Sequence, residues 1–85
     1  MSYFVETIPL GYAQFVCHFQ LVISPSANKY FIKLMNDNGV PVAFEMKQQS
    51  PKRWVLIQPA PPWASQVEHL LSEAIIANEE SGASN

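Results

Sequence analysis

The stretch KYFIKLMNDNGVPVAFEMK, residues 29–47, decides the fold class of this chain. On both sides of NDNG (36–39), apolar side chains occupy alternate positions, which is the period of a β-strand with one buried face. Asn and Gly both tolerate positive φ, so NDNG between two such runs is a strong hairpin signal. The stretch therefore predicts two antiparallel strands joined by a tight turn.

Residues 12–23 extend the β-pattern toward the N-terminus. From Phe15 to Ile23 the odd positions are wholly apolar and the even positions are mixed, which predicts one dry and one mixed face. At about 3.3 Å per residue the strand would run about 40 Å, so a bend or bulge is expected inside it. Residues 3–8 are also β-prone. They are expected to form either a short edge strand or an arm lying on a neighbouring subunit.

Toward the C-terminus, residues 48–52 predict a turn and residues 53–58 a last strand. Beyond them the apolar period becomes that of a helix, and Pro59–Trp63 is expected to link strand and helix. The helical stripe consists of Trp63, Val67, Leu70, Leu71, Ala74 and Ile75.

The two ends of this helix are predicted from separate signals. Pro61 and Pro62 favour a start at their position, whereas the capping-box pattern Ser65–Glu68 favours a start about one turn later. Glutamates at 79–80 are unfavourable near a helix C-terminus, so the helix is expected to end near Asn78.

These elements predict an α+β fold: an antiparallel sheet of four to five strands in meander order, with one C-terminal helix packed across one face. Residues 1–80 are expected to form a single α+β domain, and residues 81–85 a flexible C-terminal tail. The core is expected to contain Phe15, Phe19, Leu21, Tyr30, Ile32, Leu34, Val42, Phe44, Trp54, Leu56, Trp63, Val67, Leu70, Leu71 and Ile75.

The composition bounds how such a small domain is stabilised. Its 85 residues leave room for one core, and a chain this short is marginally stable without an added staple. Cys17 is the only cysteine, so no disulfide framework exists. Together with His18 and His69 it falls short of the four ligands of a closed zinc site, so no metal is expected. Oligomerisation is the remaining common staple.

Charge and the N-terminal sequence bear on location and partners. Only 14% of the residues are charged, against about 25% in typical soluble domains, so either neutral polar groups cover the surface or a partner covers part of it. The net charge of −2 gives no general attraction to nucleic acid or to anionic membranes. The first residues resemble no signal peptide and no stretch is long enough to span a membrane, so a cytoplasmic location is expected.

The motifs of catalysis are missing from the sequence. Cys17 and His18 are neighbours in a strand, so their side chains point to opposite faces, and Cys17 is expected to be a buried structural thiol. Glu68 and Glu73 do not share a helix face closely enough for an acid and base pair. No glycine-rich phosphate loop is present. We therefore expect no catalytic residue and no cofactor, and the chain is not expected to be an enzyme.

The second face of the sheet is the strongest candidate for a functional surface. All five basic residues lie between positions 29 and 53, and four glutamates lie between 63 and 80, so the sheet side is cationic. Single-stranded nucleic acid is disfavoured, because Phe31 is the one clear stacking residue there. The predicted binding residues are His18, Phe31, Lys33, Met35, Glu45, Val55 and Ile57.

One helix covers only one face of a sheet, whereas apolar residues occur on both. The leading prediction is therefore a non-catalytic protein-interaction module, which forms a homo-oligomer such as a dimer or binds a protein partner through its second face. The first alternative is a small-ligand domain whose pocket lies at a subunit interface, with Tyr12, His18 and Lys33 as polar contacts. The second alternative, an enzyme, ranks last.

Overall fold

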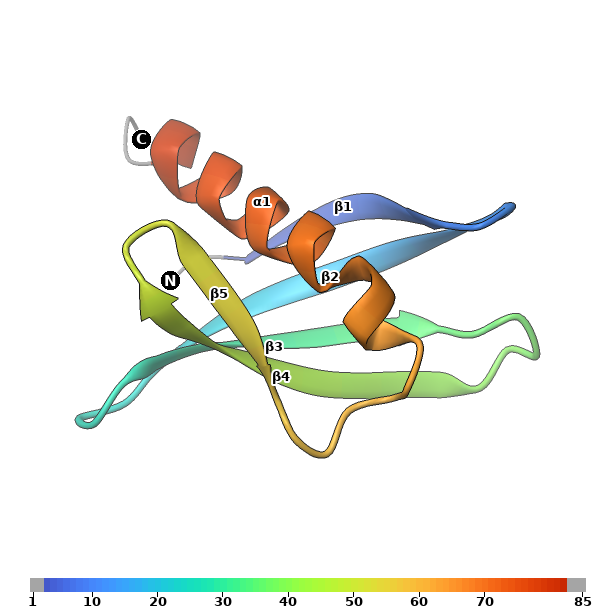
Figure 1. Cartoon of the computed structure of the whole chain (residues 1–85), viewed down its shortest axis with the longest axis horizontal. Helices are drawn as coiled ribbons and strands as arrows, with labels where there is room; N and C mark the ends of the chain where they lie inside the picture. The colour runs from blue at the N-terminus through green and yellow to red at the C-terminus, as the bar shows by residue number, and fades with distance from the viewer. Residues whose placement is uncertain (1–2, 83–85) are drawn as a thin grey trace.

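The computed structural model describes residues 3–82 and contains five strands followed by one helix (Figure 1). The strands form one antiparallel sheet in the order β1-β2-β3-β4-β5, so each strand pairs with the next one in sequence. The α+β class, the meander and the single C-terminal helix are thus confirmed. The elements are β1 (Tyr3–Leu10), β2 (Ala13–Ile23), β3 (Asn28–Met35), β4 (Pro41–Ser50), β5 (Arg53–Ile57) and α1 (Ala64–Gly82).

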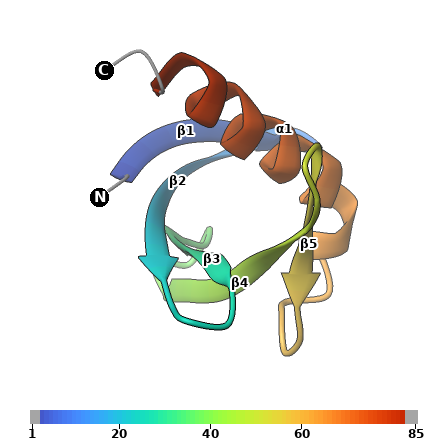
Figure 2. The same cartoon turned by 90° about the vertical axis from the view of Figure 1, so that its left-hand side faces the viewer.

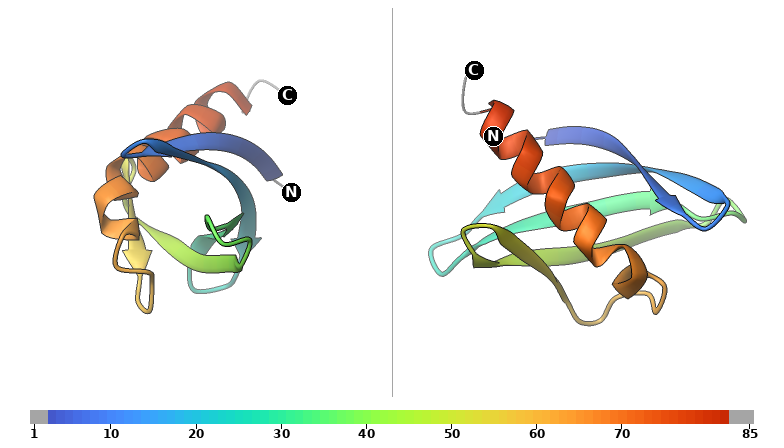
Figure 3. Two further views of the ribbon diagram at one scale, coloured as in Figure 1. Left: turned by 90° about the vertical axis from the view of Figure 1, so that its right-hand side faces the viewer. Right: turned by 45° about the horizontal axis from the view of Figure 1, so that its top comes forward.

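The sheet is strongly coiled, and α1 lies across its open side. Viewed end-on in Figure 2, the strands curl from β1 round to β5, and the helix spans the gap between these two strands. The views in Figure 3 agree with this arrangement, and the helix contacts both β5 and β1. The core therefore fills the concave side of the sheet beneath α1, and the opposite side of the sheet remains uncovered.

The first strand belongs to the sheet of its own subunit. β1 pairs with β2 from Tyr3–Gln20 to Leu10–Ala13, so the alternative of an arm on a neighbour is wrong. The two residues between the strands are Gly11 and Tyr12, and Gly11 has φ +61°. Tyr12, the second turn residue, does not have positive φ. A two-residue hairpin turn with positive φ at its first position alone is of type II′, which favours glycine there.

Of the bend or bulge expected in the long second strand, the bulge is absent, whereas β2 does curve along its length (Figure 2). β2 keeps an unbroken register with both neighbours, and the register shift of the sheet lies instead between Gln48 and Ser50 of β4. The length of β2 has another cause, because its two neighbours use different parts of it. β1 pairs with Ala13–Gln20, whereas β3 pairs with His18–Ile23.

The NDNG segment forms the predicted hairpin turn. The Asn36 side-chain Oδ1 accepts hydrogen bonds from the backbone N–H of Asn38 (2.9 Å) and of Val40 (3.0 Å). Gly39 has φ +76°, in the region that side chains disfavour. Asparagine thus supplies the acceptor and glycine the backbone freedom that the turn requires.

The core is aromatic and mostly as predicted. Phe19, Tyr30 and Trp54 are fully buried, and the Tyr30 and Trp54 rings meet edge to face with centroids 5.0 Å apart. Ile8 and Met46 are buried but were not predicted, and Leu70 was predicted but is exposed. The full buried set is Ile8, Cys17, Phe19, Tyr30, Ile32, Leu34, Phe44, Met46, Trp54, Ala64, Val67, Leu71 and Ile75.

The helix begins at the proline signal and not at the capping box. The Ala64 N–H donates to the Pro61 carbonyl at 2.9 Å, so Ser65 already lies inside the helix. Glu68 does not reach back to Ser65; its Oε2 accepts a hydrogen bond from the Leu56 N–H at 2.8 Å. A contact with the sheet has therefore replaced the local cap that the sequence pattern predicted.

The helix also ends later than expected, at Gly82 and not near Asn78. Tertiary contacts offset the cost of glutamates near its C-terminus: Glu79 accepts a hydrogen bond from Tyr30, and Glu80 pairs with Lys52 at 2.7 Å. Ser81 and Gly82, assigned to the tail, are helical, and residues 83–85 of that tail lie outside the described residues.

Helix side chains satisfy the backbone of the last strand. The Trp54 N–H donates to Ser72 Oγ at 2.9 Å, and the Leu56 N–H donates to Glu68 as described. Ser72 is buried. These bonds cover the free edge of β5, which would otherwise expose unpaired donors.

Replacement of Ser72 by alanine leaves the buried Trp54 N–H without an acceptor. We expect Ser72→Ala to lower the free energy of unfolding by about 1–3 kcal/mol, measured by urea denaturation. The control is Glu73→Ala, which removes an exposed pair with His69 and should cost about 0.5 kcal/mol or less. Equal midpoints for the two variants would contradict the role given to Ser72.

Glu79 makes stability depend on pH. Burial raises the pKa of its carboxyl, and the hydrogen bond from Tyr30 partly opposes this rise. A raised folded-state pKa stabilises the fold below the unfolded-state pKa, and that contribution is lost as pH rises through the folded-state pKa. Glu79→Gln, which keeps an acceptor for Tyr30, should therefore raise the urea midpoint at neutral pH. The gain should vanish near about pH 3, where the carboxyl is protonated in both states.

The control for this comparison is Glu80→Gln, which weakens the exposed pair with Lys52 and removes no buried charge. It should give no gain in midpoint at either pH. A midpoint of Glu79→Gln that equals the wild type at neutral pH would contradict the argument.

Candidate functional site

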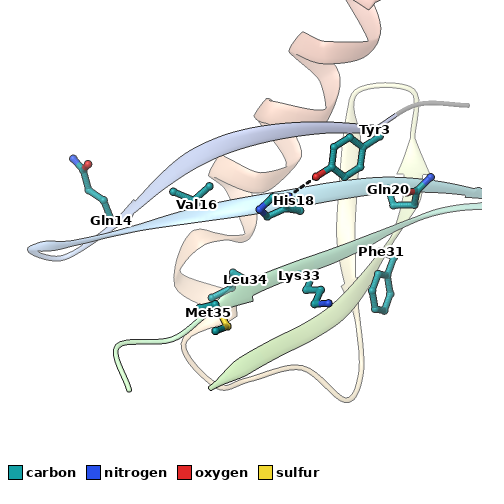
Figure 4. A pocket seen from close by; sticks show the side chains of 9 residues that line it. All are labelled: Tyr3, Gln14, Val16, His18, Gln20, Phe31, Lys33, Leu34 and Met35. Carbon is teal, nitrogen blue, oxygen red and sulfur yellow. Dashed lines mark hydrogen bonds between the residues drawn. The ribbon is translucent and has the colours of Figure 1, made fainter. Parts of the chain in front are cut away.

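The uncovered side of the sheet, here called the outer face, carries the side chains that alternate with the core positions. It includes Tyr3, Val5 and Thr7 of β1; Gln14, Val16, His18, Gln20 and Val22 of β2; Lys29, Phe31, Lys33 and Met35 of β3; Ala43, Glu45 and Lys47 of β4; and Val55 and Ile57 of β5. The helix lies behind this face in the view of Figure 4.

The register brings most of the predicted binding residues side by side. His18 lies opposite Lys33 across the β2–β3 ladder. Glu45 lies opposite both Phe31 on β3 and Ile57 on β5, so these three side chains form one row across the sheet. The predicted Met35 and Val55 lie opposite Pro41 and Lys47.

A groove of about 700 Å³ crosses the β1–β3 part of the outer face (Figure 4). Among the predicted residues, His18, Phe31, Lys33 and Met35 line it, whereas Glu45, Val55 and Ile57 do not. The sequence prediction also omitted lining residues. The complete lining is Tyr3, Gln14, Val16, His18, Gln20, Phe31, Lys33, Leu34 and Met35.

The groove opens where two strands separate. The β2–β3 ladder ends at the pair His18–Lys33, although both strands continue beyond it. Residues 13–17 of β2 follow β1, and residues 34–35 of β3 follow β4. We call the opening between these two segments the wedge; the strands diverge there in Figures 1 and 4. The wedge explains why Leu34, whose side chain belongs to the core side, also borders the groove.

Tyr3 and His18 meet at the rim of the groove. A hydrogen bond joins the Tyr3 hydroxyl to His18 Nδ1, and the two ring centroids lie 6.0 Å apart. Tyr3 was not predicted as a site residue. Its place follows from the Gly11 turn, because this two-residue hairpin sets Tyr3 opposite Gln20 and diagonal to His18.

The outer face carries cations without counter-ions. Within residues 3–82, no ion pair involves Lys29, Lys33 or Lys47. Lys29 and Lys47 lie directly opposite each other on neighbouring strands, an arrangement that destabilises a sheet. Glu45 is the one carboxylate on this face in the described part of the chain. The face is therefore cationic as predicted, and it surrounds an apolar groove.

The described residues offer little else to catalysis. Cys17 is buried on the core side, as predicted, whereas His18 lies on the outer face, so the two cannot act together. Burial raises the pKa of the Cys17 thiol to about 11, and a protonated thiol is a poor nucleophile. Between residues 3 and 82, no three His, Cys, Asp or Glu side chains converge as metal ligands.

Comparison of the chain with protein-family models, curated proteins and solved structures found no match. Among the described residues, no helix is both long enough and apolar enough to cross a membrane. The functional argument therefore depends on the geometry of the outer face.

Cys17 reports on whether the wedge exposes the core. At about pH 8 the native thiol should react with iodoacetamide about 100-fold more slowly than the urea-unfolded chain, because its pKa is raised from 9.0 to about 11. Mass spectrometry over time measures the rate. Labelling of the folded protein at the unfolded rate would mean that the wedge opens through to the core.

Proposed function

We propose that this chain is a non-catalytic protein-interaction module that binds another protein chain through the outer face of β1–β3. The partner is either a second copy of this chain or a different protein, the two classes that the sequence left open. A cytoplasmic location stays a prediction.

The observation that carries the proposal is where the exposed large apolar side chains gather. Of the ten in the described residues, six lie on the outer face of β1–β3: Tyr3, Val5, Val16, Val22, Phe31 and Met35. Tyr3, Val16 and Met35 each expose more than half of their surface. The other four are scattered over two turns, the end of β2 and the helix: Tyr12, Ile23, Val40 and Leu70. Large apolar side chains that gather on one exposed face are typical of a surface that a partner covers.

The shape of the face favours a macromolecule over an enzyme's substrate. The groove lies on an open sheet surface, and its polar groups are a tyrosine, a histidine, a lysine and two glutamines, with no carboxylate among them. Tyr3 and His18 bond to each other, and neither touches a carboxylate that would orient a catalytic base. These features support binding without chemistry.

A small-ligand domain is the second candidate, and the groove volume favours it. About 700 Å³ is within the range of small-molecule pockets. The expected polar contact Tyr12 does not line the groove, since it is fully exposed at the β1–β2 turn. The lining of the groove comes from strands of one subunit. A thermal shift with a metabolite panel tests this candidate, because a bound ligand raises the melting temperature.

Phe31→Glu tests the proposed function. A charge in the centre of the outer face should abolish association, while stability should fall by about 1 kcal/mol, because Phe31 is outside the core but the new carboxylate lies opposite Glu45. Urea denaturation checks that the variant remains folded. Light scattering at several concentrations measures self-association. A photo-crosslinking amino acid at position 35, in cells, measures binding to a different protein. The matched control is Tyr12→Glu, which adds the same charge in place of an exposed aromatic away from the face.

A specific result is loss of mass or of crosslinked adducts in Phe31→Glu but not in Tyr12→Glu. If the wild-type chain is a monomer at every concentration and position 35 gives no adduct, the proposed function is wrong.

A further inference from the structure

We propose that the partner is an acidic, apolar segment of a different protein, which binds in extended form and adds to β2 as a strand inside the wedge. This inference rests on the proposed function and names the chemistry of the partner. Three independent features of the outer face support it: an open strand edge, an apolar groove beside that edge, and a lysine without an ion pair, Lys33, at its end.

The open edge follows from the register. In a hairpin with a two-residue turn, the residues that flank the turn form a hydrogen-bonded pair, and here they are Leu10 and Ala13. Hydrogen-bonded and non-hydrogen-bonded pairs then alternate along the β1–β2 ladder. Odd-numbered residues of β2 therefore direct their N–H and C=O groups toward β1, and even-numbered residues direct theirs toward β3. Because the β2–β3 ladder ends at His18, the backbone groups of Gln14 and Val16 face the wedge without a partner strand.

The other edges of the sheet are less suitable for strand addition. The free edge of β5 is occupied, because its Trp54 and Leu56 donors bond to Ser72 and Glu68 of α1. The helix also lies against β1, where residues 6–9 and the helix border a shallow depression. Among the described strand edges, the wedge is the one that borders the apolar groove. Strand addition at an open edge is a common way for a sheet to bind an extended peptide.

The groove beside this edge suits the alternating side chains of a strand. A peptide paired with Gln14 and Val16 would place every second side chain on the outer face. There it would meet the exposed side chains of Val16 and Met35, and Phe31 lies further along the groove. Apolar residues at alternate positions of the peptide would thus cover the patch described above.

The lysines determine the charge of the partner. Lys33 lies at the narrow end of the wedge, opposite His18, and within the described chain it has no ion pair. Lys29 and Lys47 lie further along the same face and repel each other. A carboxylate on the bound segment would pair with Lys33, and the cationic face would speed association and select acidic partners.

A second copy of this chain fits the surface less well. Its outer face carries the same lysines, so face-to-face pairing would bring like charges together. Four of its seven acidic residues, Glu68, Glu73, Glu79 and Glu80, lie on a helix, which cannot add to a strand edge. Nucleic acid is disfavoured because it makes no use of an open strand edge.

The experiment uses titration calorimetry with the full chain and a synthetic peptide whose residues of one parity are valine, except for a glutamate at the position of that parity nearest Lys33, and whose intervening residues are threonine, so that valine and glutamate share the outer face. The peptide should bind the wild type, and Lys33→Glu should weaken binding by about tenfold or more. Lys52→Glu is the matched control, because Lys52 lies in the β4–β5 turn and pairs with the helix, so it should leave binding unchanged. Higher salt should weaken binding.

Methylation of peptide nitrogens tests strand addition without altering the protein. N-methyl groups at one set of alternate positions should abolish binding, because they remove the donors that face β2. Methyl groups at the other set should be tolerated. Equal tolerance of both sets, or equal binding of a peptide with lysine in place of glutamate, would overturn the inference.

Two further outcomes separate this inference from the proposed function. If oligothymidylate binds and the acidic peptide does not, the partner is nucleic acid and both ideas fail. If neither binds while Phe31→Glu dissociates an assembly of the wild-type chain, the acidic partner is wrong and the proposed function stands with a second copy as occupant.

Discussion

The attachment of α1 to the last strand is the constraint on which the rest of this structure depends. Ser72 and Glu68 accept the free backbone donors of β5, and the buried side chains Val67, Leu71 and Ile75 fill the concave side of the sheet. This arrangement uses the single helix to complete the core. The convex side of the sheet then has no covering element among the described residues, and its apolar side chains remain at the surface. A small domain with one helix cannot bury two faces of a sheet.

The groove is a product of strand stagger and not of any single residue. β2 pairs with β1 along one part and with β3 along another. On the N-terminal side of His18, β1 and β2 therefore stay paired with each other but separate from β3. The open backbone edge, the apolar surface and the lysines all result from this geometry combined with the side-chain alternation of β2 and β3. Their coincidence on one side of the sheet supports recognition of an extended acidic chain more strongly than any one of them alone.

Much of the fold followed from local rules, and the deviations have physical causes. Alternation from Lys29 to Lys47 and the Asn36–Gly39 turn predicted the central hairpin, and the same parity placed His18, Phe31, Lys33 and Met35 together. Tyr3 was missed because its position depends on the length of the Gly11 turn. The end of α1 was misplaced because distant residues, Tyr30 and Lys52, compensate its glutamates. No local pattern encodes such long-range contacts, nor the point at which two paired strands separate.

The meander also has a kinetic consequence. Backbone contacts link each element to its successor, and the one exception in the described chain is the contact between α1 and β1. Short-range contacts of this kind close small loops and permit rapid folding, hairpin by hairpin. The contact between α1 and β1 is different, because it brings opposite ends of the polypeptide together and so carries the entropy cost of closing a long loop. It is therefore the place where the native state is expected to fray first, through local opening that leaves the central hairpins intact.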